Sequence, residues 1–597
     1  MRSPTFDARF VVATAIGCTL VTAFCCASPA LAANPAPLYA PLAHGAVASD
    51  TPDASAAGAE VLAQGGSAAD AAIATALALG VVSPSGSGLG GGGFAVLWDA
   101  KSKQAKVLDF REVAPAAATR DMYAHDPVPD AQHPARSIVG GLAVAVPAES
   151  AGLAMLHDAY GKLSLAKDAA PAARLARGFY PTRRLAAAIA RIAPTLDADD
   201  PLRRWMMPGG KPATTTTKVV RPHLADTLVR YGKSGHDAIY EGAIAAEIVQ
   251  TVRSHGGILT TADLDAYRPL WRDPLMGQFR GREIVTAPPP AGGLTTIEAI
   301  QFLDALPALP RGSLDSSQYL HRVAEALTHA FADRARWMGD PAFFPVPTAK
   351  LASPAYAKEL VKRFSDDTVL QLEQYGTATE KGATADPAHD HGTTHVCVID
   401  SEGNAVALTT TVNLELGSRL ETPRSGIILN DQMDDFASAP GKPNGFGLVG
   451  AEANSIAPGK RPASSMSPLL VVKDGQVVMC AGGSGGPTIV ASTLQAVVAV
   501  IDEGADAETA VATPRVYAQW RPERLRVEGD IPEDVTRALA KRGHKIVRMP
   551  TSSFAPAVQV ILRSGDELEA AADPRKGGVP ASPSSVKHLT VIHGGKR

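Results

Sequence analysis

The chain has 597 residues, and its 57 Lys and Arg nearly balance 60 Asp and Glu, giving a formal net charge of −3. This balance, without a basic stripe, argues against a nucleic-acid-binding protein. Only five cysteines are present, and three of them lie within the first 26 residues. The fold therefore depends on a large apolar core and not on disulfides.

The first 32 residues have the pattern of a secretory signal peptide. Arg2 and Arg9 give a basic start, residues 10–24 are apolar, and Ala30-Leu31-Ala32 is a small-x-small cleavage signal. We therefore expect an exported protein, periplasmic or secreted. No later run reaches the roughly 18 apolar residues of a membrane-spanning helix, so we expect no stable span after signal removal.

Two helices are predicted next, over residues 54–64 and 67–79, followed by a glycine-rich segment at 86–93. The glycines match G-x-G-x-x-G in letters only, because a helix precedes them and a strand at 94–98 follows. A dinucleotide site needs the opposite order, strand then glycines then helix. We therefore interpret the segment as a crowded backbone corner, and we expect no cofactor.

A strand at 107–112 places Arg111 near its end. Arg111 is open to two interpretations, a surface ion pair or a bidentate clamp for a substrate carboxylate. Residues 150–380 are predicted to be mostly helical, with an amphipathic helix at 318–338. A loop is expected at 208–218, and a rigid Pro-Gly turn at 288–293 precedes a helix from about Thr295.

The segment DHGTTHVCVIDSEGNAVALTTTVN, at 390–413, predicts a β-hairpin with its turn at 401–404. Its pairing places Thr411 and Asn413 beside Thr393, within one residue of register. Gly392 lets a hydroxyl approach its carbonyl closely, so attack by Thr393 would cut the chain there. The new terminus would combine a hydroxyl with an α-amine of pKa about 8, an activated nucleophile. The alternative is a simple Thr-rich strand start.

Three histidines near this hairpin, His389, His391 and His395, resemble a metal cluster. No H-E-x-x-H or C-x-x-C accompanies them, and two lie in a polar loop at 383–392. We therefore expect a solvated loop and no metal.

Further along, residues 425–436 predict a strand followed by a polar cluster, and 437–450 form a loop long enough to be a lid. Residues 476–481 predict a strand, 482–486 a turn and 488–503 a helix, whose first N–H groups suit an oxyanion site. This last segment also fits G-x-S-x-G, so a serine α/β-hydrolase using Ser484 is a rival interpretation. The β-α repeats expected before such a turn are missing.

Seven motifs in order resemble the γ-glutamyltranspeptidase family of N-terminal-nucleophile hydrolases. They are GLGGGGF at 88–94, DFRE at 109–112, TTHV at 393–396, TTTVN at 409–413, NDQMDDF at 430–436, RPASSMSP at 461–468 and GGSGGP at 482–487. The resemblance implies an α/β fold of four layers, an αββα sandwich. It also implies cleavage between Gly392 and Thr393 into a large subunit, 33–392, and a small subunit, 393–597, which stay together as a heterodimer.

The resemblance also implies the roles of individual residues. Thr393 would be the nucleophile and Thr411 its supporting hydroxyl, while Gly485 and Gly486 would form the oxyanion hole. The substrate α-carboxylate would be held by Arg111, Ser464 and Ser465, and its α-amino group by Asn413, Gln432 and Asp435. Phe446 stands where relatives often have Tyr in the lid, and Ser484 replaces a Pro of the glycine turn.

The implied activity is cleavage of the γ-glutamyl bond of glutathione and its conjugates, with transfer to water, amino acids or peptides. Two alternatives remain beside the serine hydrolase. One is a glutaryl-cephalosporin acylase of the same superfamily, and the other is an unprocessed envelope binding protein.

Overall fold

The computed structural model describes residues 36–124, 126, 134–377, 392–438, 441–550 and 556–585. The predicted signal peptide, and His389 and His391, lie outside these residues. No helix in the described ranges is both long enough and apolar enough to cross a bilayer.

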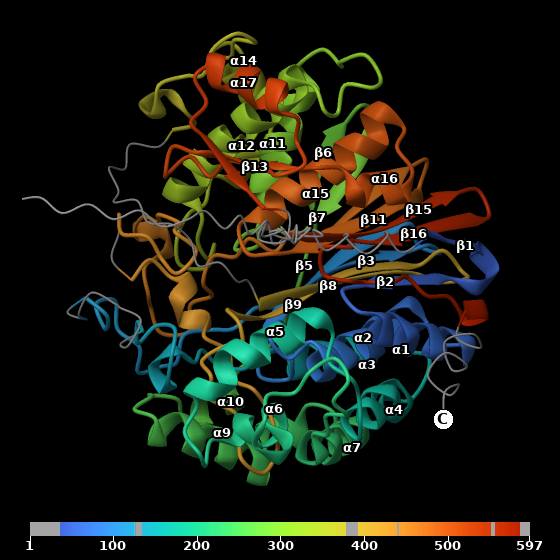
Figure 1. Cartoon of the computed structure of the whole chain (residues 1–597), viewed down its shortest axis with the longest axis vertical. Helices are drawn as coiled ribbons and strands as arrows, with labels where there is room; N and C mark the ends of the chain where they lie inside the picture. Colours follow the sequence, from blue (N-terminus) through green and yellow to red (C-terminus); the bar gives the residue numbers. More distant parts are fainter. Residues whose placement is uncertain are drawn as a thin grey trace, which may run out of the picture. The chain divides into compact units, whose positions relative to one another are not determined.

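Two antiparallel sheets form the centre of the described chain (Figure 1). The first has the order β2 (Ala46–Ser49), β8 (Gly392–Ile399), β9 (Ala405–Asn413), β3 (Gly92–Asp99), β4 (Gln104–Phe110) and β5 (Leu270–Arg272). The second has the order β1 (Leu38–Pro41), β16 (Glu567–Ala572), β15 (Ala557–Ser564), β11 (Gln476–Ser484), β10 (Leu469–Lys473), β7 (Arg282–Thr286) and β6 (Leu275–Phe279).

The two sheets face each other across an apolar core, where β8 and β9 contact β11. Large side chains from both sheets fill it, among them Phe94, Ile399, Leu470 and Ile561. Cys397 and Cys480 also lie here, buried and unbonded to each other. Because both faces of each sheet are covered, every residue of β8 and β9 is buried.

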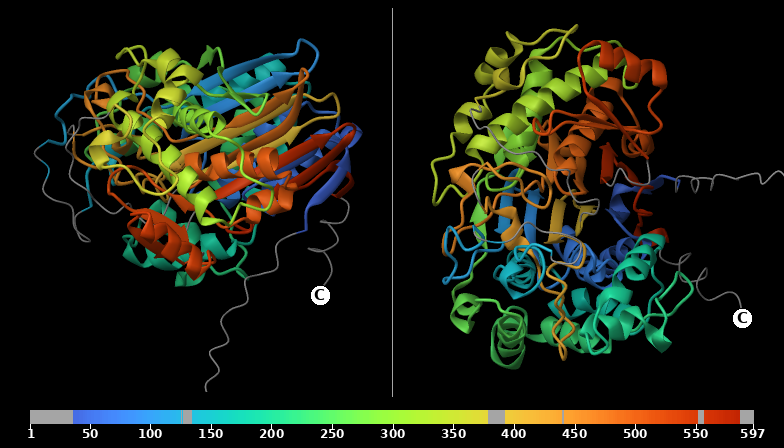
Figure 2. Two further views of the ribbon diagram at one scale, coloured as in Figure 1. Left: turned by 90° about the horizontal axis from the view of Figure 1, so that it is seen from above. Right: turned by 60° about the vertical axis from the view of Figure 1, so that its left-hand side comes forward.

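Helices cover the outer face of each sheet (Figure 2). The first sheet packs on α1 (Pro52–Ala63), α2 (Ala68–Val82) and α3 (Glu149–Tyr160), and the second on α11 (Gly293–Ala305), α15 (Thr488–Val498) and α16 (Ala507–Ala512). Helix α2 is apolar nearly all round and almost completely buried, as expected for an interior helix. The predicted four-layer αββα sandwich is confirmed.

The remaining elements lie around this sandwich. On the side of the first sheet they are α4 (Leu165–Ala176), α5 (Arg183–Ile192), α6 (Pro201–Met206), α7 (Pro222–Ser234), α8 (Asp237–Tyr240), α9 (Gly242–Ser254) and α10 (Thr261–Ala266). On the other side are α12 (Ser317–Trp337), α13 (Thr348–Leu351), α14 (Pro354–Val361), α17 (Glu533–Lys541) and a small sheet of β12 (Val516–Tyr517), β13 (Leu525–Glu528) and β14 (Ile546–Met549).

The hairpin β8–β9 has the predicted register, with Thr393 opposite Thr411 and Thr394 opposite Thr410. A bulge between Gly392 and Thr393 sets Gly392 opposite Asn413. In the turn, the Asp400 N–H donates to the Asn404 carbonyl at 3.0 Å. The hairpin lies between β2 and β3, so it is a central pair of strands, hydrogen-bonded on both sides.

Two local predictions were wrong, and one feature was not foreseen. Residues 425–430 form only isolated bridges, such as Gly90 with Leu429, and no regular strand. The glycine turn begins later than expected, because Gly482, Gly483 and Ser484 continue β11 and pair with β15. Residues 150–380 are mostly helical as predicted, but the three short strands β5, β6 and β7 within 270–286 were not foreseen.

Candidate active site

Thr393 lies near the start of β8 and is only 4% exposed. Its Oγ1 is 3.0 Å from Thr411 Oγ1. The Thr411 hydroxyl donates to the Gly392 carbonyl at 2.6 Å and accepts from the Asn413 N–H at 2.9 Å. Since the Thr411 proton is used on Gly392, the Thr393 hydroxyl is the donor to Thr411. One hydroxyl thus holds the candidate nucleophile and polarises the carbonyl beside it.

Gly392 occupies a position with no room for a side chain. A Cβ there would lie 2.3 Å from the Ser85 carbonyl oxygen and 2.4 Å from that of Leu414. Both obstacles are backbone atoms, which cannot swing away as a side chain would. Glycine is therefore required at this position by close backbone approach.

A buried ammonium group also contacts the nucleophile residue, which the sequence analysis missed. Lys576 Nζ donates to the Thr393 carbonyl at 2.8 Å and lies 3.2 Å from Asp50 Oδ2. The same carboxylate accepts from Ser484 Oγ at 2.9 Å and from Gln559 Nε2 at 2.7 Å. No local pattern could have revealed this, because Asp50 and Lys576 are 526 residues apart.

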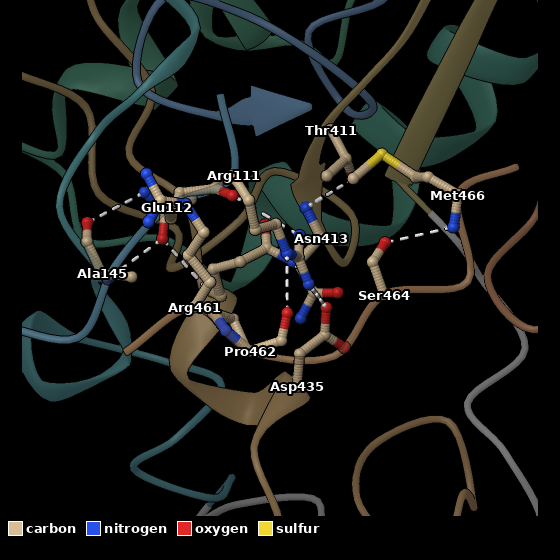
Figure 3. A network of polar contacts seen from close by, with 12 residues as sticks. Arg111, Glu112, Ala145, Thr411, Asn413, Asp435, Arg461, Pro462, Ser464 and Met466 are labelled. Atoms are coloured by element: carbon tan, nitrogen blue, oxygen red, sulfur yellow. Dashed lines mark hydrogen bonds and ion pairs between the residues drawn. The ribbon is translucent and has the colours of Figure 1, made fainter. Parts of the chain in front are cut away.

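Arg111 follows β4 and is completely buried, so its interpretation as a surface ion pair was wrong. Its Nε donates to the Pro462 carbonyl at 3.2 Å and its Nη2 to the Ala463 carbonyl at 3.1 Å (Figure 3). Nη2 also forms an ion pair with Asp435, whose side chain is 11% exposed. Backbone carbonyls therefore fix the orientation of the guanidinium.

The neighbouring Glu112 has a different character, because burial raises its pKa to about 8 despite the nearby Arg111. Near neutral pH its carboxyl is largely protonated. Asp435 is then the principal negative partner of the Arg111 guanidinium.

Three predicted binders of an amino group lie close together. Gln432 Nε2 donates to Asp435 Oδ2 at 2.7 Å, and Asn413 Nδ2 donates to the Asp431 carbonyl at 3.1 Å. The Gln432 Oε1 atom is buried and accepts no hydrogen bond from the described residues. An unpaired buried amide oxygen beside a carboxylate is a suitable acceptor for an ammonium group.

Ser464 and Ser465 are buried on the segment before β10. The Ser464 hydroxyl accepts from the Met466 N–H at 3.1 Å (Figure 3). Ser465 Oγ accepts from Arg334 Nη2 at 3.4 Å, and the Arg334 Nε has no partner among the described residues. Arg334, on α12, is a second guanidinium that the sequence analysis missed.

The predicted oxyanion residues Gly485 and Gly486 follow β11, with φ values of 128° and 59°. These positive values favour glycine. The two glycines directly follow Ser484, whose hydroxyl binds the same Asp50 carboxylate as Lys576. Because Lys576 also donates to the Thr393 carbonyl, the glycine turn lies in the neighbourhood of Thr393.

The predicted lid is attached to the site by Asp434. Its carboxylate accepts from Ser137 Oγ at 2.7 Å and from the Gly445 N–H at 2.8 Å, and burial raises its pKa to about 6. Phe446 is 5% exposed and belongs to the same apolar cluster as Leu414 and Leu448. In the described parts of 437–450 the lid is thus folded against the body of the protein.

The serine-hydrolase interpretation was wrong. The Ser484 hydroxyl donates to Asp50 and forms no hydrogen bond with a histidine of the described chain, and the central sheets are antiparallel. His395, the third of the histidines near the hairpin, is buried in β8, where a strand was predicted, with Nδ1 2.8 Å from Thr409 Oγ1.

The sequence was compared with known protein families and with individual proteins. Residues 54–582 match the family described as Gamma-glutamyltranspeptidase. The chain is 37% identical over 536 residues to the glutathione hydrolase proenzyme of Escherichia coli (strain K12), covering 89% of this chain and 90% of that protein. It is 36% identical over 560 residues to glutathione hydrolase 2 of Arabidopsis thaliana, covering 90% and 93%.

A solved structure is similar over nearly its whole length. Cephalosporin acylase from Bacillus halodurans superposes with a TM-score of 0.79 at 28% identity, covering 94% of this chain and 99% of that one.

Proposed function

The chain belongs to the γ-glutamyltranspeptidase family of enzymes, and we propose that it cuts itself after Gly392 and then cleaves γ-glutamyl amides such as glutathione through Thr393. The hydroxyl bridge from Thr411 to Thr393 and to the Gly392 carbonyl carries the proposal. The acyl group would pass to water or to the amine of an amino acid or peptide.

The proposed self-cleavage starts from the hydrogen bonds of Thr411 to Thr393 and to the Gly392 carbonyl. Thr393 Oγ1 attacks the Gly392 carbonyl carbon, an ester forms, and the Gly392–Thr393 C–N bond breaks with the hydroxyl proton passing to the new amine. Water then hydrolyses the ester. Thr411 polarises the carbonyl from the start, because it already donates to that oxygen at 2.6 Å.

In the mature enzyme the free α-amine of Thr393 serves as the base for its own hydroxyl. Attack on the γ-carbonyl of the substrate gives a γ-glutamyl ester and releases the amine. The backbone N–H groups of Gly485 and Gly486 are the proposed donors to the tetrahedral oxyanion. The proposed reaction steps use no metal or cofactor.

The charges at the substrate end favour a γ-glutamyl group. Such a group carries both a carboxylate and an ammonium on one carbon, and the site offers Arg111 and Asp435 side by side. Ser464 and Ser465 directly follow Ala463, whose carbonyl accepts from the Arg111 guanidinium. On binding, the substrate carboxylate would pair with Arg111 and the substrate ammonium with Asp435, in place of the ion pair between these two side chains. Asn413 and the unpaired Gln432 Oε1 add acceptors for the ammonium.

The likeness to a cephalosporin acylase supports a second candidate, an enzyme that removes a glutaryl side chain. Glutaryl lacks the ammonium, so binding it would draw Arg111 away and leave the Asp435 carboxylate without a positive partner. Such an unpaired carboxylate is costly and would repel the substrate's own charge. We therefore rank the acylase second.

The test has two parts. Purified protein on a denaturing gel should show two chains, with Thr393 as the first residue of the smaller, whereas Thr393→Ala should stay uncut and inactive. A single uncut chain in the wild type would favour the binding-protein alternative, and a processed, active Thr393→Ala variant would refute the nucleophile.

The second part compares kcat/KM for a γ-glutamyl anilide and its glutaryl analogue. We expect the wild type to prefer γ-glutamyl, and Asp435→Asn to narrow the preference because the ammonium loses its counter-charge. A wild-type preference for glutaryl would make the enzyme an acylase.

The remaining parts of the proposal concern assembly and location. The pieces 33–392 and 393–597 would stay together as one heterodimeric unit, and removal of residues 1–32 would accompany export to the periplasm or the medium. Sequencing the first residue of the larger chain tests the second point.

A further inference from the structure

A cluster of two imidazoles and a carboxylate lies outside the site described above, between α12, α17 and β14 (upper part of Figure 1). His321 and Glu325 are four residues apart on α12, so they share one face of the helix. His544 comes from the turn between α17 and β14. One ligand atom from each residue lies within 4.8 Å of the others.

The hydrogen bonds around His321 leave one nitrogen available. Its Nε2 lies 2.8 Å from the Ser365 carbonyl, which can only accept, so Nε2 carries the proton. Nδ1 therefore presents a lone pair, and it faces His544 Nε2 at 2.7 Å. Orientation of one ring nitrogen by a backbone carbonyl is the usual arrangement of a metal-binding histidine.

The carboxylate completes the set. Glu325 is 1% exposed; its Oε1 accepts from the Tyr375 hydroxyl at 2.7 Å, whereas Oε2 is buried without a hydrogen-bond partner among the described residues. A cavity of about 40 Å³ is lined by Glu325, Tyr375 and His544. That volume exceeds the ~10–15 Å³ that one water needs.

We propose that His321 Nδ1, His544 Nε2 and Glu325 Oε2 bind one Zn²⁺ ion, with a water in the cavity as fourth ligand. Two imidazoles, one carboxylate and a water are a common zinc set, and zinc prefers nitrogen ligands where Mg²⁺ and Ca²⁺ prefer oxygen. Two guanidinium groups lie nearby: Arg322 is paired with Asp366, and Arg542 donates to the Asp366 carbonyl and to Ser317 Oγ.

The rival arrangement is a proton in place of the ion, with His544 Nε2–H donating to His321. The 2.7 Å separation suits that hydrogen bond, since two nitrogens on one tetrahedral zinc lie about 3.3 Å apart for Zn–N bonds of about 2.05 Å. Binding would thus require the rings to separate by about 0.6 Å. His544 is the half-buried member and lies in the connection between α17 and β14, so it is the ring that we expect to move.

The experiment measures metal on the full-length purified enzyme. Protein stripped with a chelator, loaded with zinc and desalted should retain about one equivalent, whereas His544→Gln and Glu325→Gln should each lose at least tenfold in zinc affinity. The matched control is His157→Gln, in a cluster where His157 lies 3.9 Å from buried Asp168; it should keep the zinc. Melting curves establish that each variant is folded.

Cobalt gives a second readout that needs no variant. Substituted Co²⁺ should produce the intense visible bands of a tetrahedral site, and Mg²⁺ in excess should not displace it. Failure of the wild type to retain zinc above the His544→Gln level, or loss of zinc in His157→Gln instead, would overturn the proposal in favour of the proton-bridged pair. Processing and peptidase assays are independent of this result.

Discussion

Replacing Thr411 by valine tests the hydroxyl on which the proposed self-cleavage depends. Valine has nearly the same shape, so the strand pairing of β9 is kept, but it removes three contacts. These are the contact with Thr393 Oγ1 at 3.0 Å, the bond to the Gly392 carbonyl at 2.6 Å and the bond from the Asn413 N–H at 2.9 Å.

The size of the effect follows from these contacts. Loss of one preorganised donor to a developing oxyanion costs about 2.7–4 kcal/mol, or 10²–10³ in rate. The unpaired, buried Asn413 N–H adds a loss of about 1–3 kcal/mol in the free energy of unfolding. Thr411→Val should therefore cut itself at least about 100-fold more slowly than the wild type.

The assay follows the uncut chain on a denaturing gel against time after purification. Thr411→Ser is the matched control, because it keeps the hydroxyl and loses only a methyl group; it should process within about tenfold of the wild type. Urea unfolding of both variants separates a loss of stability from a loss of rate. Wild-type processing by Thr411→Val would refute the reasoning, since the carbonyl would then be activated by another group.

Three further predictions follow from single contacts. Arg111→Lys should raise KM for a γ-glutamyl anilide about 10- to 100-fold while sparing self-cleavage, because lysine cannot reproduce the fork held by two carbonyls; an unchanged KM would remove Arg111 from the substrate site. Gly392→Ala should block processing, since its Cβ would meet the backbone oxygens of Ser85 and Leu414; efficient cleavage in this variant would show that the precursor backbone differs here. Burial and the neighbouring Asp70 raise the pKa of Asp168 to about 8, so its contribution to stability is present in full below pH 4 and is lost as pH rises toward 8. Asp168→Asn should therefore unfold at higher urea than the wild type at pH 8 and show less difference at pH 4; an equal difference at both pH values would contradict this titration.

Much of the site could be predicted because its signals are local in the sequence. The β-branched alternation of 394–399 and the SEGN turn fix the hairpin, and the register then places Thr411 opposite Thr393. The glycines of 482–483 misled the analysis because they serve close packing and not a turn: a Cβ on Gly482 would lie 2.2 Å from the His395 ring. They therefore continue a strand.

The residues that were missed have no such local signal. Asp50, Lys576 and Arg334 reach the site from elements distant in the chain, and none of them belongs to a recognisable motif. Of the three short strands at 270–286, β5 and β6 are edge strands and β7 lies next to β6; alternation in them is brief, and exposed side chains such as Met276 interrupt it. Only the three-dimensional pairing with β4 and β10 identifies them.

The position of the hairpin has a consequence for refolding. Strand β8 pairs with β2 on one side, and β9 pairs with β3 on the other, so the first hairpin after the proposed cut is held between two strands that precede it. Before cleavage, regaining this arrangement is an intramolecular search. After cleavage it becomes an encounter between two separate polypeptides, whose rate depends on their concentration. A cleaved enzyme diluted from urea should thus recover less activity at lower protein concentration, whereas the uncut Thr393→Ala chain should regain its fold at a rate independent of dilution.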